Sequence, residues 1–189
     1  MISQFRRSAV RADAARNRDK IVEAARTAFR TRGYDAPLDD IAKAAGVGAG
    51  TLYRHFPTRE SLVDAVMQAW VERVGDAVGK VLAEGGSSRE LLLRWFGQYV
   101  ELISVHKGGP AKITLAMEDD CSPMRTKCQT LRTANAQIIE QLGDDLRPGV
   151  DSLQFARLIG GIASVVDQGN LPATSVGPML EVVVDGLLV

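Results

Sequence analysis

Apolar residues recur at helical spacing through the first third of the chain. Between about residues 14 and 32 they fall three and four positions apart, at Ile21, Ala24, Ala25, Ala28 and Phe29. Gly33 follows as an expected helix stop. Two segments with similar spacing come next, over about 38–45 and 49–56, and each is too short to be a stable helix alone. The pattern therefore predicts three helices that pack on one another.

The rest of the sequence predicts further helices and no strand. A long helix is expected over about 59–83, with Thr58 as its N-cap, and the loop at 85–88 ends it. Helices then follow over about 89–105, 111–118, 123–142, 151–167 (with Asp151 as cap) and 177–188. The expected fold is all-α. Residues 1–57 form a small N-terminal domain, and residues 58–189 contain the long helix and a bundle of about five further helices.

The last two expected helices are apolar on nearly every side. Such a helix needs a second surface to cover it, and a partner subunit is the natural source in a chain of this size. The expected homodimer contacts are Leu158, Ile162, Val165, Val166, Leu180, Val183, Val184 and Leu187. Gly160 and Gly161 lie mid-helix, where they lower helix propensity but permit close backbone approach.

Composition fits a globular protein, but its charge is divided between the two parts. Residues 1–57 carry 11 Lys/Arg and 6 Asp/Glu, a net charge of +5, whereas residues 58–189 carry −5. A basic part indicates an anionic partner such as nucleic acid, or alternatively an ordinary solvated basic face. Arg6, Arg7 and Arg11 are expected in a basic tail, either disordered or reaching DNA.

Several other classes of protein are not indicated. No run of 18 apolar residues could cross a membrane, and no apolar segment follows the first arginines, so the cytoplasm is the expected location. Cys121 and Cys128 are too few for a disulfide framework and lack a surrounding cluster of metal ligands. No nucleophile–base arrangement is visible. We therefore expect no enzyme activity, no metal and no cofactor.

The segment from Ile41 to Phe56 has the geometry of a helix-turn-helix. Ala42 is small where the two helices cross, and Gly46 tolerates the positive φ of a tight turn. Ile41, Val47 and Leu52 are placed to hold both helices to a third. The outward edge of the second helix is then left to Gly48, Ala49, Gly50, Thr51, Tyr53, Arg54 and His55. In such units this helix enters the major groove of DNA.

At these residues the chain resembles a known family. The run GVGAGTLYRHFPTRESLVDAV is similar to the signature of the tetracycline-repressor (TetR) family of bacterial regulators, most of all to members of an actinobacterial type. The similarity spans about residues 17–70 and implies an N-terminal DNA-binding domain, a long connecting helix and a variable ligand-binding domain. The chain departs from the family at three places: Pro37-Leu38 replaces a Thr or Ser, Gly48-Ala49 replaces a Ser-Lys pair, and the basic tail before Arg18 is longer than the family minimum.

The resemblance implies roles for individual residues. Thr51, Tyr53 and Arg59 match phosphate contacts of the family, while Arg54 and His55 become the expected base readers, since Arg can donate two hydrogen bonds to guanine. Tyr53 could instead be a packing aromatic, His55 a structural residue and Arg54 a solvated charge. The complete expected DNA-contact set is Lys43, Gly48, Ala49, Gly50, Thr51, Tyr53, Arg54, His55, Thr58 and Arg59.

An effector pocket is expected inside the C-terminal bundle. Such pockets are mostly apolar with a few polar anchors. The candidate lining residues are Trp95, Phe96, Tyr99 and Met117, with His106, Asp167 and Gln168 as polar anchors, although each could equally belong to the core.

Together these features predict a homodimeric, ligand-responsive repressor. Its expected partners are a near-palindromic double-stranded DNA operator and a small-molecule effector of unknown identity that releases the protein from DNA. One alternative is a low-specificity dimeric DNA-binding protein without an effector. Another is a ligand-binding module or enzyme with a vestigial DNA-binding head.

Overall fold

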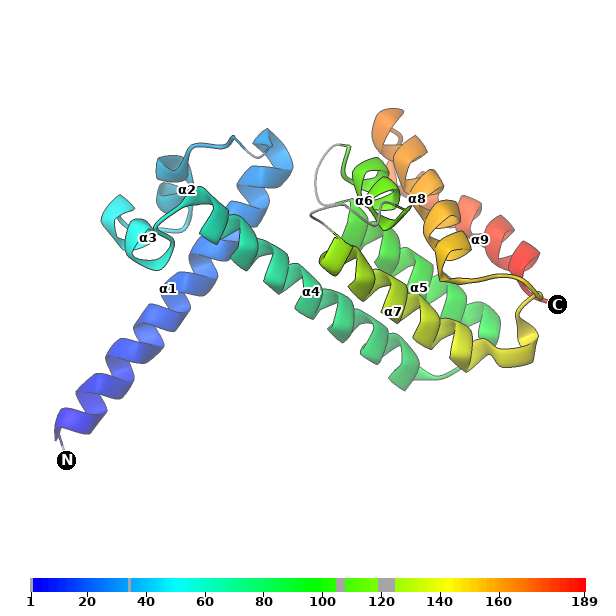
Figure 1. The fold of residues 1–189 in the computed structure, drawn as a ribbon, viewed down its shortest axis with the longest axis horizontal. Helices are drawn as coiled ribbons and strands as arrows, with labels where there is room; N and C mark the ends of the chain where they lie inside the picture. Colours follow the sequence, from blue (N-terminus) through cyan, green and yellow to red (C-terminus); the bar gives the residue numbers. More distant parts are fainter. Residues whose placement is uncertain (1, 34, 105–107, 119–124) are drawn as a thin grey trace. The chain divides into compact units, whose positions relative to one another are not determined.

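The computed structural model describes residues 2–33, 35–104, 108–118 and 125–189, and Figure 1 shows their helices. Across these ranges the regular structure is helical, apart from one antiparallel bridge between Leu146 and Leu188. The α-helices are α1 (Ile2–Arg32), α2 (Leu38–Ala44), α3 (Ala49–His55), α4 (Arg59–Glu84), α5 (Ser88–Ile103), α6 (Gly109–Glu118), α7 (Arg125–Leu142), α8 (Ser152–Gln168) and α9 (Val176–Leu187). Two short 3₁₀ helices are η1 (Gly143–Asp145) and η2 (Ala173–Ser175). The all-α prediction is confirmed.

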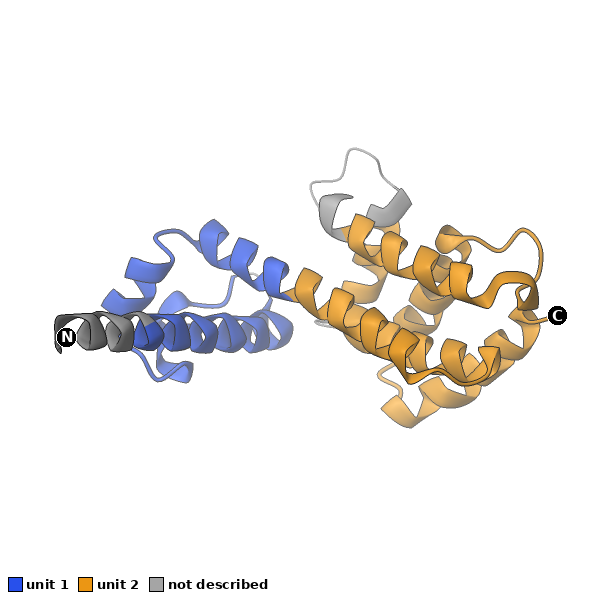
Figure 2. Cartoon of the chain, turned by 90° about the horizontal axis from the view of Figure 1, so that it is seen from below, with its two compact units in different colours: residues 1–69 blue, residues 70–189 orange. Residues whose placement is uncertain are grey.

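The chain forms two compact units, residues 1–69 and 70–189, which Figure 2 colours separately. The boundary falls inside α4 rather than at its start, where the sequence places the domain boundary. Leu62 and Val66 of α4 are buried in the core of the first unit, which explains why the early turns of α4 belong there. α4 is thus a single helix with residues in both units.

In the first unit α1 packs against α2 and α3, which also pack against each other. Ile21, Ile41 and Leu52, one from each helix, are fully buried. α1 begins at Ile2, so the expected start at about residue 14 was wrong. Arg6, Arg7 and Arg11 indicated a basic tail over residues 2–13, although Ile2, Phe5 and Ala9 are spaced as in a helix.

In the second unit α5 packs against α6, α7, α8 and α9. Its N-terminus is fixed by a capping box in which the Ser87 hydroxyl accepts from the Glu90 N–H and Glu90 accepts from the Ser87 N–H. α8 has the same arrangement with Asp151 and Gln154, so the predicted Asp151 cap is confirmed. Ser122 and Pro123, the expected start of the preceding helix, lie outside the described residues.

The residues exposed on α8 and α9 agree only in part with the expected dimer contacts. Leu158 and Val165 of α8 are 39% and 56% exposed, as a contact surface requires. The expectation needs correction for Leu180, Val184 and Leu187, which are buried in the chain's own core. They lie on the side of α9 that packs against α5 and α8. Val182, which was not in the expected set, is 75% exposed.

α6 and α8 approach closely because Gly160 has no side chain. A Cβ at Gly160 would lie 2.0 Å from the Thr114 hydroxyl oxygen and 3.0 Å from its Cβ. Thr114 cannot easily turn away, since its hydroxyl donates to the Pro110 carbonyl at 2.9 Å. The predicted close approach is therefore present at Gly160, whereas a Cβ at Gly161 meets nothing within 4 Å.

Gly160→Ala should lower the free energy of unfolding by about 1–3 kcal/mol, because the added methyl group overpacks the crossing of α6 and α8. Gly79→Ala is the control, since Gly79 lies mid-helix in α4 with open space around its Cβ position. That variant should be neutral or up to about 1 kcal/mol more stable. Urea denaturation followed by circular dichroism measures both, and equal effects of the two substitutions would contradict the packing argument.

Candidate nucleic-acid interface

The turn between α2 and α3 depends on Gly46. Its φ of +69° lies in the left-handed region, which glycine adopts without steric cost. The Gly46 N–H donates to the Lys43 carbonyl and the Val47 N–H to the Ala42 carbonyl, both at 3.0 Å. These bonds satisfy carbonyl groups that the end of α2 would otherwise leave open. The turn predicted at Gly46 is confirmed.

The inner side of α3 is fixed by apolar burial. Leu52 is fully buried, and Phe56, just after the helix, is 3% exposed. The guanidinium of Arg18 in α1 lies 5.6 Å from the centroid of the Phe56 ring, within the range of a cation–π interaction. α3 is therefore held along its inner side and at its C-terminal end, which determines which side chains face outward.

The outer side of α3 has no acidic residue, and the first two residues of the helix, Ala49 and Gly50, have no large side chain. At 3.6 residues per turn, Gly50 and Arg54 lie opposite Leu52, with Thr51 on one flank and Tyr53 on the other. Arg54 and Gly50 are exposed, Tyr53 is 46% exposed, and Thr51 is half-buried. This face thus presents a positive charge between two hydroxyl groups.

Arg54 is folded back along α3 toward its N-terminus. Its Nε donates to the Gly50 carbonyl and its Nη2 to the Thr51 hydroxyl oxygen, each at 3.1 Å. Gly48, the N-cap of α3, makes no side-chain capping bond and, like Ala49, is exposed. The guanidinium therefore lies beside the Gly50 carbonyl and the Thr51 hydroxyl, next to residues that provide almost no side-chain atoms.

Other expected DNA contacts have partners within the protein. The Thr58 hydroxyl accepts from the Ser61 N–H at 3.1 Å and so caps α4, as predicted. Arg59 donates through Nη1 to the Ala36 carbonyl at 2.8 Å. His55 is half-buried with its ring centroid 6.3 Å from that of Phe56, whereas Lys43 is exposed on α2. The geometry thus favours Tyr53, Arg54 and Lys43 as the accessible side chains.

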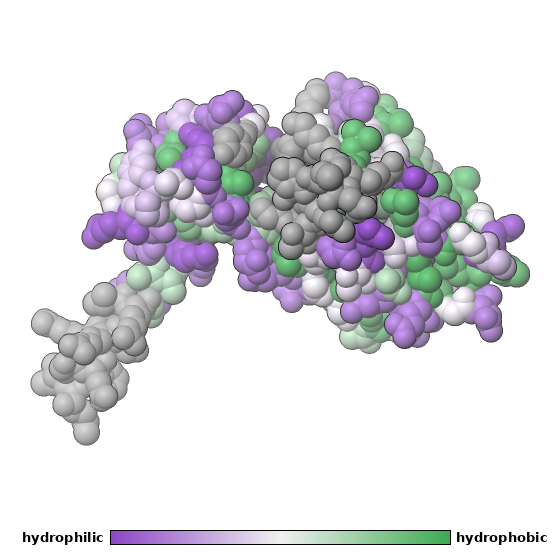
Figure 3. Space-filling view, in the orientation of Figure 1, coloured by the Kyte–Doolittle hydropathy of each residue, from purple (hydrophilic) through white to green (hydrophobic). Residues whose placement is uncertain are grey.

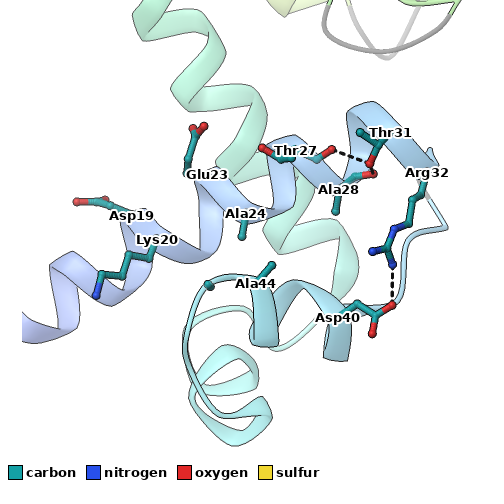
Figure 4. Close-up of a pocket in the computed structure, with 11 residues that line it drawn as sticks. Asp19, Lys20, Glu23, Ala24, Thr27, Ala28, Thr31, Arg32, Asp40 and Ala44 are labelled. Carbon is teal, nitrogen blue, oxygen red and sulfur yellow. Dashed lines mark hydrogen bonds and ion pairs between the residues drawn. The ribbon is translucent and has the colours of Figure 1, made fainter.

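A groove in the same unit lies between α1 and α2 and is distinct from this face (Figure 4). Its volume is about 730 Å³, and its residues are Asp19, Lys20, Glu23, Ala24, Thr27, Ala28, Thr31, Arg32, Asp40, Ala44 and Ala45. An ion pair of 2.7 Å between Arg32 and Asp40 joins the two helices at one end. None of the lining residues comes from α3, so the groove takes no part in the interface.

The expected effector residues include a buried aromatic cluster in the second unit. Trp95 and Tyr99 meet edge to face at 5.8 Å between ring centroids, and Phe96 meets Phe155 at 4.9 Å. Burial raises the pKa of Tyr99, and its hydrogen bond with Asn135 opposes that effect. These side chains fill the centre of the unit.

Asn135 is a buried polar residue at the aromatic cluster that the sequence reading missed. It is completely buried, accepts from Trp95 Nε1 at 2.9 Å and donates to the Ser152 carbonyl at 3.1 Å. The available signal was an amide side chain within an apolar helical stripe that includes Leu131 and Ile138. A buried amide of this kind requires hydrogen-bond partners.

Of the remaining effector candidates, the structure describes the side chains of Asp167 and Gln168. Asp167 accepts from the Gly108 N–H at 2.7 Å, and Gln168 is exposed at the end of α8. His106 and the side chain of Met117 lie outside the described residues, as does Cys121. Cys128 is a buried free thiol whose pKa is raised by burial.

Within the described part of the chain, no three His, Cys, Asp or Glu side chains group as a metal site requires. Of the helices described, none has both the length and the apolarity needed to cross a membrane.

Two short helices joined by a glycine turn, with the second presenting a basic outer face, define a helix-turn-helix DNA-binding unit. Residues 21–66 match the family described as bacterial regulatory proteins, tetR family. A TetR transcriptional regulator from Streptomyces coelicolor has 31% identity and a TM-score of 0.71 over 90% of this chain and 98% of its own. The TetR transcription regulatory protein from Mycobacterium vanbaalenii has 30% identity and a TM-score of 0.67, with 95% and 99% covered. The chain therefore belongs to the TetR family of bacterial regulatory proteins.

A curated relative aligns over a shorter region. The HTH-type transcriptional repressor KstR2 of Rhodococcus jostii is 36% identical over 76 residues, which cover 40% of this chain and 37% of that protein. KstR2 of Mycolicibacterium smegmatis is 32% identical over 90 residues, covering 47% and 44%. The matched region thus spans less than half the length of these relatives.

Gly46→Ala should destabilise the first unit by about 1–2 kcal/mol, the cost of the left-handed conformation for a residue with a Cβ. Gly50→Ala is the matched control, because Gly50 lies inside α3 without a positive φ and has open space around its Cβ position. Thermal unfolding of both variants, followed by circular dichroism, tests the difference. Equal melting temperatures would show that the turn does not depend on positive φ at residue 46.

Proposed function

We propose that this chain is a homodimeric transcriptional repressor that binds a near-palindromic operator and is released by a small-molecule effector. The observation that carries the proposal is the exposed, acid-free outer face of α3 in a helix-turn-helix unit. Repression, rather than activation, is supported by the relative KstR2, which is a transcriptional repressor. In this proposal the protein binds operator DNA in the bacterial cytoplasm.

The flanking hydroxyl groups of α3 suit the two walls of a major groove. With α3 lying in the groove, Thr51 and Tyr53 face phosphates on opposite sides, and Arg54 between them faces base edges. Exposed Lys43 adds a phosphate contact from α2. The smaller surface at Gly48, Ala49 and Gly50 permits close approach of the DNA, with His55, Thr58 and Arg59 at its edge.

Dimerisation is supported by the uncovered apolar residues of α8 and α9. Leu158, Ile162 and Val165 follow helical spacing on α8, with Val166 beside them, while α9 exposes Val182 and partly Val183. Green, hydrophobic residues are visible in Figure 3 over the region where Figure 1 draws these helices. Large exposed apolar side chains in such numbers typically mark an interaction surface. A twofold dimer would present two α3 helices to half-sites about 34–36 Å apart.

Effector release would act through the second unit. A ligand that favours the conformation with poor DNA affinity must weaken DNA binding by the same factor by which DNA weakens the ligand. The aromatic cluster of Trp95, Phe96 and Tyr99 with buried Asn135 offers the apolar lining and polar anchor that such a ligand requires. Because the cluster is packed, ligand entry must displace side chains. α4, which has residues in both units, is the element through which the change would reach the DNA-binding unit.

Selection of DNA fragments by the purified protein tests the proposal directly. A repressor should prefer its selected operator over random DNA by about 10³-fold or more. Binding with salt dependence but without this preference would support a low-specificity DNA-binding protein instead. No salt-dependent binding at all would overturn the proposal in favour of a module whose head no longer binds DNA.

Arg54→Ala should remove discrimination at one base pair of each half-site. A bidentate arginine–guanine contact contributes about 1–3 kcal/mol, which corresponds to about 5- to 150-fold in relative affinity. The measurement is the ratio of dissociation constants for the operator and for operators changed one base pair at a time. An unchanged ratio at every position would show that Arg54 reads no base.

Val182→Asp should dissociate the dimer, because the carboxylate would lose its hydration in an apolar interface. Tyr53→Asp is the control: Tyr53 is 46% exposed on α3, in the first unit, and does not belong to the proposed interface of α8 and α9. Analytical ultracentrifugation at micromolar concentration should give a monomer for the first variant and a dimer for the second. A wild-type protein that is already monomeric would overturn the dimer proposal.

A further inference from the structure

On the outer face of α3, Arg54 and Thr51 form a hydrogen bond that bears on how the helix recognises a DNA sequence. Arg54 and Thr51 lie three residues apart, so they are neighbours on the helix surface. Nη2 of Arg54 donates to the Thr51 hydroxyl oxygen, and Nε donates to the Gly50 carbonyl, both at 3.1 Å. Two groups of α3 therefore fix the position and rotation of the guanidinium.

The bonds use one edge of the guanidinium and leave the other edge available. Arginine has five N–H donors in a planar fork. Nε and the adjacent hydrogen of Nη2 form the side edge, and that edge is directed to Gly50 and Thr51. The end edge, formed by Nη1 and the second hydrogen of Nη2, has the spacing needed for guanine O6 and N7.

The residues next to the Arg54 guanidinium are small, so its end edge is not covered by neighbouring side chains of α3. Gly48, Ala49 and Gly50 are exposed and provide no polar side chain at the N-terminal end of α3. A Cβ at Gly48 or Gly50 would meet nothing within 4 Å, so no protein atom obstructs this side of the helix. In a helix-turn-helix, the N-terminal residues of this helix approach base edges most closely. Through its bonds to the Gly50 carbonyl and Thr51, Arg54 supplies a donor next to that region.

We propose that Thr51 is a positioning residue for base reading: its hydroxyl oxygen holds Arg54 so that the end edge of the guanidinium meets a guanine. This inference rests on the proposed function, since it requires a sequence-specific operator. Holding the guanidinium before DNA arrives lowers the conformational entropy lost on binding. The Thr51 hydrogen stays available to donate to a phosphate, so positioning and phosphate contact can coexist.

The two roles of Thr51 predict different results. If Thr51 contacts phosphate only, its removal weakens binding to all sequences nearly equally. If it positions Arg54, its removal reduces discrimination at the base pair read by Arg54. Thr51→Val keeps the branched shape of the side chain and removes the hydroxyl, whereas Thr51→Ser keeps the hydroxyl. Thr31→Val is a matched control, since Thr31 bonds only carbonyls of α1 among the contacts described.

The experiment compares full-length variants on the selected operator and on the operator with its Arg54-dependent base pair changed. Thr51→Val should reduce the ratio of dissociation constants by about fivefold, and Thr51→Ser should restore it. In the Arg54→Ala background, Thr51→Val should change the ratio no further, because the two residues act as one unit. Thr31→Val should leave the ratio unchanged. Melting temperatures establish that each variant is folded.

Arg54→Lys provides a second test that does not depend on Thr51. Lysine keeps the positive charge but lacks the planar fork, so the ratio should fall as in Arg54→Ala while affinity for random DNA is retained. An unchanged ratio in Thr51→Val or in Arg54→Lys would overturn the inference. A wild-type protein that selects no sequence would instead overturn the proposed function, so the two failures are distinguishable.

Discussion

Leu52 is fully buried against residues of α1, α2 and the first turns of α4, and α3 depends on that contact. A seven-residue helix is not stable alone in water, so tertiary burial must supply its stability. Burying one leucine side chain contributes about 1.5–3 kcal/mol. Because Leu52 and Phe56 fix the rotation of α3, they also determine that Gly50 and Arg54 face outward. Core packing in this unit thus specifies the DNA-binding face.

The second unit shows the opposite combination, a polar group inside a packed core. Asn135 accepts from Trp95, donates to the Ser152 carbonyl and has a hydrogen bond with Tyr99, and leaving it unpaired in the core would cost about 1–3 kcal/mol. A ligand that displaced Trp95 would therefore have to replace that hydrogen bond. The proposed effector would then be largely apolar, with a donor group placed for the Asn135 carbonyl oxygen.

Much of the fold could be predicted from sequence because helix boundaries carry local signals. Gly46 and Asp151 were identified correctly as a turn and a cap, since each acts on its own neighbouring backbone. The start of α1 was missed because Arg6, Arg7 and Arg11 indicated a basic tail, although apolar residues at helical spacing precede residue 14. The faces of α9 were also missed: nearly every position is apolar, so the sequence could not distinguish buried Val184 from exposed Val182. Asn135 required knowledge of which helices meet.

At the DNA-binding interface, the orientation of a single side chain, Arg54, could not be predicted from the sequence. The sequence indicated few reading groups at Gly48, Ala49 and Gly50, and it placed the reading function further along the helix. The spacing of Thr51 and Arg54 allows a contact, but spacing alone does not determine a rotamer. In the structure Arg54 turns back toward Gly50 and Thr51. The neighbouring small residues therefore leave room for the guanidinium, which is held by its own helix, to approach a base.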